Sequence, residues 1–293
     1  MAPEVRARAH GYWRQAWQRL RSRRVALIAG AVIALIALLA FAGPQLSGIR
    51  YDSLDWDALA VPPQLGSGAH WLGTDRLGRD LFVRTLYGVR ISLVIGLLAS
   101  AVSLVIGLVW GMVAGYSGGR TDELMMRAVD VLYSLPYLFI VIILTTLFER
   151  GSLVVLFVAI GAVGWLTIAR IVRGQTRVLA RSEFVEAARA FGVTPAAMLW
   201  RHIVPNLSGT LVAYATLAIP QMILFESFLS FLGLGVQEPL PSLGNLINDG
   251  AREMQSAQWM LLVPAGFLIT LLLSFSLVGD ALRDALDPRE RAP

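Results

Sequence analysis

The stretch ISLVIGLLASAVSLVIGLVWGMVAGYSGG, residues 91–119, contains no charged side chain. A helix needs roughly 20 apolar residues to cross about 30 Å of hydrocarbon, so this stretch is long enough to span a membrane. Other charge-free runs of about that length occur along the chain, and the complete set is Val25–Ile49, Ile91–Gly119, Val131–Phe148, Gly151–Ala169, Asn206–Phe225 and Ala257–Gly279. The sequence therefore predicts an all-α, polytopic membrane protein with six transmembrane helices.

The composition agrees with a membrane protein and excludes several chemistries. Of 293 residues, 56% are hydrophobic and only 15% are charged, which is too apolar for a soluble globular surface. All 25 basic residues are Arg, so neither a P-loop lysine nor a Schiff-base lysine is available. Cysteine is absent and the only imidazoles are His10, His70 and His202. We therefore expect a non-catalytic chain with no metal site and no bound cofactor.

The distribution of Arg predicts the orientation in the membrane. Seven Arg precede the first apolar run, which is longer than the apolar part of a signal peptide, so we expect it to stay in the membrane uncleaved. With the N-terminus inside, the inside segments hold 18 of the 25 Arg, and these segments are 1–24, 120–130, 170–205 and 280–293. By the positive-inside rule, both termini are expected in the cytoplasm.

The runs divide the chain into regions of different character. The N-terminal arm places Trp13, Trp17 and Leu20 on one helical face, which predicts a helix lying among the lipid headgroups, with a frayed cytoplasmic tail as the alternative. The expected order is an arm 1–24, a first span 25–49, an external segment 50–90, a five-helix core 91–280 with a long inside loop 170–205, and a tail 281–293. Six Arg in that loop would be too costly to bury, so it must lie outside the hydrocarbon.

The segment Ser182–Pro205 has the pattern of two short helices joined by a turn. Ser182 can cap the first helix, Gly192 can end it through a positive φ, and Thr194-Pro195 can begin the second. Apolar residues recur at i, i+3, i+4 and i+7, and they are Phe184, Ala187, Ala188 and Phe191. The small alanine pair lets another backbone approach closely, so the segment is predicted to be a docking element, with a membrane-surface loop as the alternative.

This segment resembles the EAA loop of permease subunits of ABC importers. The resemblance rests on Glu186-Ala187-Ala188, the following Gly192, and Val204-Pro205 at their relative spacing. In that family the loop is the docking site for the ATPase, which implies an ATPase-docking role here for Phe184, Glu186, Ala187, Ala188, Phe191, Gly192 and Pro205.

Two further motifs make the chain similar to one branch of the family, the dipeptide and oligopeptide permeases. They are Leu72-Gly73-Thr74-Asp75 with Gly78-Arg79-Asp80 in the external segment, and Asp280 to Pro288 near the end. The stretches Ile171 to Thr176 and Phe225 to Pro239 look most like the C subunit of oligopeptide permeases. The resemblance covers about residues 20–290 and implies the type I ABC importer permease fold.

What the resemblance implies is a subunit of an assembly in the bacterial inner membrane. A homologous second permease subunit would complete the translocation path, and two ATPase subunits would bind ATP and dock on the inside loops. A periplasmic oligopeptide-binding protein would deliver peptide to the external face, and segment 50–90 would lie in the periplasm. The other partner is the lipid bilayer, and no nucleic acid is expected.

Glu226 is an ionisable residue in an apolar run near the outer end of the fifth span. Such residues are functional candidates, so it is either a lining residue of the translocation path or an interfacial carboxylate that reaches water. An importer of dipeptides or of a metal chelate remains an alternative, which the neighbouring binding-protein gene would resolve. An ion-coupled secondary transporter or intramembrane enzyme is less favoured, because paired helix breaks and a nucleophile–base set are not apparent.

Overall fold

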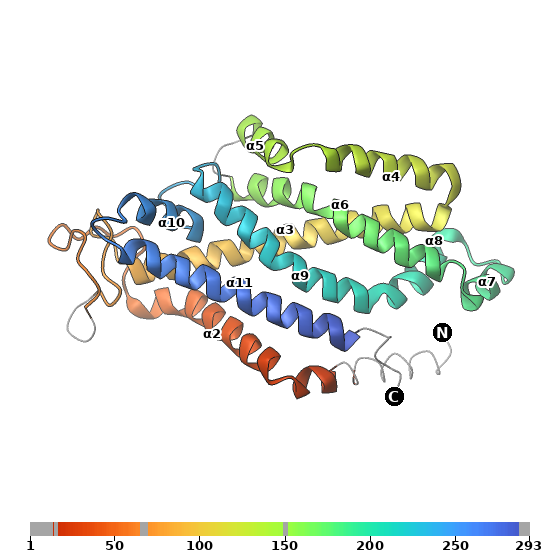
Figure 1. Ribbon diagram of the computed structural model, residues 1–293, viewed down its shortest axis with the longest axis horizontal. Coiled ribbons are helices and arrows are strands. Elements are labelled where there is room, and N and C mark those ends of the chain that lie inside the picture. The colour runs from red at the N-terminus through yellow and green to blue at the C-terminus, as the bar shows by residue number, and fades with distance from the viewer. Residues whose placement is uncertain (1–13, 15–16, 65–69, 149–151, 287–293) are drawn as a thin grey trace.

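The computed structural model describes residue 14 and residues 17–64, 70–148 and 152–286, and Figure 1 shows their arrangement. Its elements are α2 (Arg24–Ser47), α3 (Leu81–Ser117), α4 (Gly119–Ser134), α5 (Tyr137–Leu147), α6 (Leu153–Leu179), α7 (Glu183–Ala190), α8 (Pro195–Met198), the π-helical turn η1 (Leu199–Ile203), α9 (Val204–Phe231), α10 (Leu243–Arg252) and α11 (Trp259–Leu286). Within the described ranges the only β-type pairing is an isolated bridge between Thr74 and Asp80. The predicted all-α class is confirmed.

Five helical stretches are long and apolar enough to cross a membrane, and they are α2, α3, α6, the continuous stretch Pro195–Phe231 and α11. Each contains the greater part of one predicted run. All five also extend beyond their predicted runs. The extensions of α3 and α6 reach charged segments: α3 begins at Leu81, inside the predicted external segment, and α6 continues to Leu179, inside the predicted loop. Both extensions carry Arg, because side chains at the ends of a bundle reach polar partners outside the hydrocarbon.

The predicted third span, Val131–Phe148, is not one continuous helix. The chain forms α4 and α5 there, and the two helices are bent by 85° at a short break. Pro136 lacks a backbone N–H and disfavours helical geometry at Leu135, whose ψ is 139°. Helix α4 is amphipathic and begins with Asp122 in its first turn, so only the bent pair as a whole can make a sixth crossing.

Close packing between α3 and α6 forms the centre of the bundle. Glycines recur at every fourth position of α3, at Gly107, Gly111 and Gly115, and face α6. A Cβ atom at these positions would lie 2.7, 2.5 and 2.6 Å from the nearest atom of α6, so only glycine permits this approach. Rows of small residues at this spacing are a common way for membrane helices to bring their backbones together.

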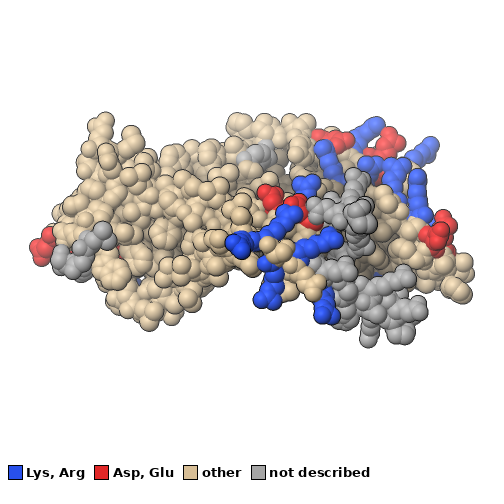
Figure 2. Space-filling model, turned by 60° about the horizontal axis from the view of Figure 1, so that its bottom comes forward, with Lys and Arg blue, Asp and Glu red and all other residues tan. Residues whose placement is uncertain are grey.

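The two ends of the bundle differ in charge. The first residues of α2 and the last of α11 lie at the end that carries α7, where Arg23 and Asp284 form an ion pair at 2.5 Å. On the face drawn in Figure 2, the charged side chains gather at this same end. Trp17 in the N-terminal arm is exposed, whereas Trp13 and residues 287–293 of the predicted tail lie outside the described residues.

Helix α9 crosses the bundle between these ends. It continues from η1 without a connecting loop and contains the buried Pro220 in its interior. Its outer end leads into the loop 232–242 and then into α10, a short helix that the apolar runs did not predict. Ser242 caps α10 in a reciprocal arrangement with Asn245, so a polar sequence signal for this helix was present.

Candidate functional site

Helix α7 and the turn after it protrude from one end of the bundle (Figure 1). One side chain of α7, Val185, is completely buried and packs in a cluster with Met112 of α3, Val172 of α6 and Met198 of α8. This contact fixes which face of α7 is directed toward the bundle. Val185 was not predicted from the sequence, because it lies beside the apolar stripe that the helical periodicity selected.

Most of the predicted apolar stripe is directed away from the bundle, but Ala188 packs against the cluster around Val185. Phe184 is 42% exposed and Phe191 is 89% exposed, and between them Ala187 is exposed and Ala188 half-buried. Glu186 is also exposed. Large apolar side chains in contact with solvent at a protruding helix are typical of an interaction surface. The structure therefore brings Phe184, Ala187 and Phe191 together on one exposed face.

The turn after α7 has the predicted geometry. Gly192 adopts a φ of +79°, and the N–H of Val193 donates to the carbonyl of Ala188 at 3.1 Å. The hydroxyl of Thr194 accepts from the N–H of Ala197 at 3.4 Å and begins α8. Ser182 occupies the predicted N-cap position of α7, but its hydroxyl donates to the carbonyl of Leu179 instead of accepting from α7.

The second half of the loop is continuous with a membrane helix. Pro205 lies in the first turn of α9, where it cannot donate a backbone hydrogen bond. The π-helical turn η1 ends immediately before this helix, and the side-chain amide of Asn206 donates to the carbonyl of His202 at 2.7 Å. Since no flexible segment separates α8 from α9, a displacement of this half of the loop is carried directly into α9.

A further contact joins α7 to the bundle. The guanidinium of Arg189 lies 5.0 Å from the centre of the Tyr116 ring and donates to the Tyr116 hydroxyl at 3.4 Å. Tyr116 is near the end of α3. The helical periodicity placed Arg189 off the stripe but indicated no partner for it, because Tyr116 is distant in the sequence.

Glu226 is completely buried, which the sequence did not predict. Its carboxylate accepts hydrogen bonds from Ser92 of α3 at 2.6 Å and from Ser230 of α9 at 2.7 Å. The hydroxyl of Ser92 also accepts, at 3.4 Å, from the N–H of Leu243 at the start of α10. Because Glu226 has no exposed surface, it neither reaches water nor lines a path in this conformation; it joins α3, α9 and α10.

Replacement of Glu226 by alanine is expected to destabilise the outer end of the bundle by roughly 1–3 kcal/mol, because buried hydroxyls lose their acceptor. Glutamine keeps the shape and one acceptor oxygen, so Glu226→Gln should retain most of the stability. Thermal unfolding of the purified protein in detergent measures the difference. Equal midpoints for wild type and Glu226→Ala would contradict this role.

An apolar cavity of about 670 Å³ opens between the α4–α5 pair, α6 and α9. Most of its lining is aliphatic or aromatic, and the uncharged polar side chains within it are Thr167, Tyr214, Gln221 and Tyr133. No residue of this cavity was predicted from the sequence, because apolar positions facing a cavity have the same pattern as positions facing lipid. In the described part of the chain, no three acidic or His side chains come together in an arrangement that could hold a metal ion.

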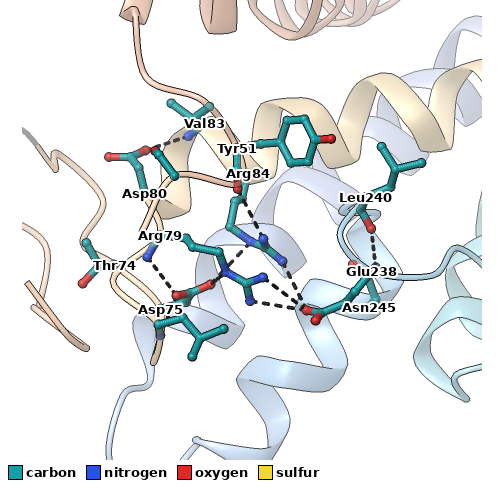
Figure 3. Close-up of polar contacts among 12 residues, drawn as sticks. Tyr51, Thr74, Asp75, Arg79, Asp80, Val83, Arg84, Glu238, Leu240 and Asn245 are labelled. Atoms are coloured by element: carbon teal, nitrogen blue, oxygen red, sulfur yellow. Dashed lines mark hydrogen bonds and ion pairs between the residues drawn. The ribbon is translucent and has the colours of Figure 1, made fainter. Parts of the chain in front are cut away.

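At the opposite end from α7, two motifs distant in sequence meet in a cluster of charges (Figure 3). Asp75 and Arg79, from the external motif, form an ion pair at 2.6 Å. Arg79 also lies 3.3 Å from Glu238 in the loop 232–242, and the buried Arg84 of α3 lies 3.5 Å from Asp75. Both motifs contributed to the family resemblance, but their contact with each other was not predicted.

His70 ties the external segment to the start of α3. Its Nδ1 lies 2.8 Å from Asp80, the N-cap residue of α3, and its Nε2 lies 3.4 Å from Asp55. Burial opposes protonation of the ring, but the two carboxylates outweigh it and raise the pKa of His70 above its ordinary value. The charged imidazole can donate to both carboxylates.

The stability of this external contact is expected to depend on pH. Because the pKa of His70 is raised on folding, its contribution is complete below the unfolded pKa of about 6.5 and is lost as pH rises through the folded value. Hydrogen exchange of residues 70–80, corrected for intrinsic rates, should show protection that falls as the solution becomes alkaline. His70→Gln should abolish this dependence, and protection that instead increases with pH would refute the prediction.

A bundle of membrane-crossing helices with an apolar cavity at its side and an exposed short helix at one end is the architecture of a membrane transport subunit. The chain belongs to the family described as binding-protein-dependent transport system inner membrane component, whose model matches residues 107–292. Residues 11–63 match the N-terminal transmembrane domain of oligopeptide transport permease C. The family resemblance found in the motifs is thus confirmed.

Relatives support the same assignment over almost the whole chain. The oligopeptide transport system permease protein OppC of Escherichia coli K12 is 50% identical over 279 residues, covering 95% of this chain and 92% of the relative. The dipeptide transport system permease protein DppC of Bacillus subtilis is 41% identical over 291 residues, covering 99% and 90%. A chain of the MetNI methionine ABC transporter in inward-facing conformations matches with a TM-score of 0.55 and 18% identity, covering 70% of this chain and 96% of that chain, which confirms the fold.

Proposed function

We propose that this chain is a membrane-spanning permease subunit of an ATP-driven importer of oligopeptides. The observation that carries the proposal is the exposed Phe184/Phe191 face of α7, which is joined through α8 and η1 to a helix that crosses the bundle. An apolar face of this kind fits an ATPase partner, and the continuous helix offers a route for its movement. The chain itself binds no nucleotide in this proposal, and the ATPase subunits hydrolyse ATP.

The cavity between α4–α5, α6 and α9 is the surface that we assign to the translocation path. It is open on the side of the subunit, so a homologous second permease subunit would close it and contribute the other half. Its mainly apolar lining with a few uncharged polar groups suits peptides of varied side chains, since no fixed charge selects among them. Selectivity would then come mainly from the periplasmic binding protein.

The orientation that fits this function places α7 and both termini in the cytoplasm and the external segment in the periplasm. The high Arg content of the α7 end supports it through the positive-inside rule. Alternating access would proceed by displacement of α7 and α8 when the ATPases close, with tilting of α9. Dipeptides are a second candidate substrate, because the Bacillus subtilis relative is a dipeptide permease.

Reconstitution tests the proposal directly. The chain is co-expressed with the permease, ATPase and binding-protein genes encoded beside it, and the purified complex is placed in proteoliposomes. We expect uptake of a labelled tripeptide that requires ATP and the binding protein and exceeds uptake of a labelled dipeptide. Uptake that persists without ATP in a proton gradient would overturn the proposal, and preferred uptake of the dipeptide would replace the oligopeptide assignment.

A further inference from the structure

The charge cluster at the outer end of the bundle has one rigid half. The carboxylate of Asp75 accepts from the N–H groups of Leu77 at 2.9 Å and Arg79 at 3.0 Å, while its other oxygen accepts from the Nε of Arg79 at 2.6 Å. The side chains of Asp75 and Arg79 are 7% and 10% exposed. Arg79 is thus held in place by a turn of its own segment, with its two terminal nitrogens directed toward Glu238 (Figure 3).

The second arginine of the cluster is incompletely paired. The Arg84 side chain is 1% exposed, and its Nε and Nη2 atoms have no hydrogen-bond partner among the described residues. Its Nη1 donates to the carbonyl of Tyr51 at 3.4 Å, and its Nη2 lies 3.8 Å from Glu238. A buried charge is stabilised only when it is well paired, so this arrangement leaves room for a closer contact.

Besides Asp75, two carboxylates act on Arg84. They are Glu238 and the half-buried Asp249 of α10, and Glu238 is the more exposed of the two. A single oxygen, Oε1, lies 3.3 and 3.4 Å from two nitrogens of Arg79 and 3.8 Å from Arg84, whereas charge-assisted hydrogen bonds are normally about 2.7–2.9 Å long. The Glu238 side chain is 60% exposed. It lies in the loop 232–242 that follows α9, so its distance from the arginines depends on where the outer end of α9 lies.

We propose that Glu238 is a positioning residue for transport, and that Arg79 and Arg84 capture its carboxylate to hold the outer end of α9 in one of the two conformations of the transport cycle. The loose contacts of Glu238 with the two arginines shorten when α7 and α8 are displaced, because α9 connects these elements directly to the loop that carries Glu238. The inference rests on the proposed function. Without the contact between Glu238 and the two arginines, the rate of ATP hydrolysis no longer depends on the position of the outer end of α9.

Glu238→Gln tests the inference in the reconstituted complex. The variant is expected to assemble normally. Its rate of ATP hydrolysis in the absence of peptide should rise toward the rate that wild type shows with peptide. Its uptake of labelled trialanine should fall by about tenfold, the order of a typical coupling between sites. Glu238→Asp keeps the charge but withdraws it by one methylene, and should give an intermediate ratio of stimulated to unstimulated hydrolysis. A merely structural role would lower both rates together.

The matched control is Glu253→Gln. Glu253 pairs with Arg76 at 3.1 Å, also between the external segment and the region around α10, but outside the buried cluster. It should leave hydrolysis and uptake unchanged. The inference would be overturned if Glu238→Gln showed a normal ratio of stimulated to unstimulated hydrolysis and normal uptake. If the glutamine variant does not assemble, the same result in Glu238→Asp would overturn it. Equal effects in Glu253→Gln would overturn it as well. Absence of ATP-dependent uptake by wild type would instead overturn the proposed function and the inference with it.

Discussion

Replacement of Gly192 by valine is expected to abolish peptide uptake while leaving the chain inserted in the membrane. Gly192 has a φ of +79° and open space around it, so the substitution meets no clash. Its cost comes from the backbone, since a β-branched residue at positive φ is strained by roughly 1–3 kcal/mol. Relief of that strain turns α7 away from α8 and displaces the face carrying Phe184 and Phe191.

The measurement is a pull-down of the tagged subunit with quantification of recovered ATPase, together with peptide-stimulated ATP hydrolysis. Ala188→Trp should act in the same way, because Ala188 packs against the cluster around Val185 and a bulky ring there displaces α7. Arg189→Ala, which loses only an exposed contact with Tyr116, should be milder. The docking role of α7 is falsified if Gly192→Val and Ala188→Trp both recover normal amounts of ATPase and show normal stimulated hydrolysis.

Gly111→Val is expected to prevent assembly of the subunit. Its Cβ would lie 2.5 Å from the carbonyl oxygen of Ala169 and 2.8 Å from the Cβ of Val172, and neither belongs to the end of a flexible side chain. The two helices must therefore separate along their central contact. Overpacking typically costs about 1–3 kcal/mol, and loss of the neighbouring glycine contacts adds to it.

Gly174→Val is the matched control, because Gly174 lies in α6 and a Cβ atom added to it would have no neighbour within 4 Å. Both variants carry the same helix propensity cost, so their difference isolates the packing between α3 and α6. The yield of monodisperse protein after detergent extraction should fall several-fold for Gly111→Val and little for Gly174→Val. Similar yields would show that the glycine row is not required for packing.

The apolar runs predicted most of the fold because burial in lipid is recorded in local composition. The third span was predicted as one helix because hydropathy does not detect the break between α4 and α5. Pro136 lies within an apolar run, and its missing backbone N–H does not change the hydropathy of that run. The extent of α3 was also underestimated. Arg84 and Arg90 lie in the first turns of α3, and in the sequence alone a charged side chain there argues against a membrane helix. The structure supplies a partner for Arg90, which donates to the carbonyl of Ala40 in α2 at 3.0 Å.

The exposed apolar face of α7 was predictable because the helical period places its residues together within one short segment. The outer cluster and the surroundings of Glu226 were not predictable in this way. Glu238 and Arg79 are 159 positions apart, and Ser92 and Glu226 are 134 apart, so no local pattern records these contacts. Two signals were nevertheless present: glycines at every fourth position in α3, and the Ser and Asn that cap α10.

The interior Pro220 of α9 sets a limit on what the proposed movement can achieve. The helix bends most easily where proline removes a backbone hydrogen bond, which divides it into an inner arm, residues 204–219, of about 24 Å and an outer arm, residues 220–231, of about 18 Å. Bending at this point absorbs part of a displacement imposed on the inner arm, so the outer arm moves less than the inner arm. The outer opening is then narrower than the displacement imposed at the coupling end, so passage of a bulky peptide requires other helices to move as well.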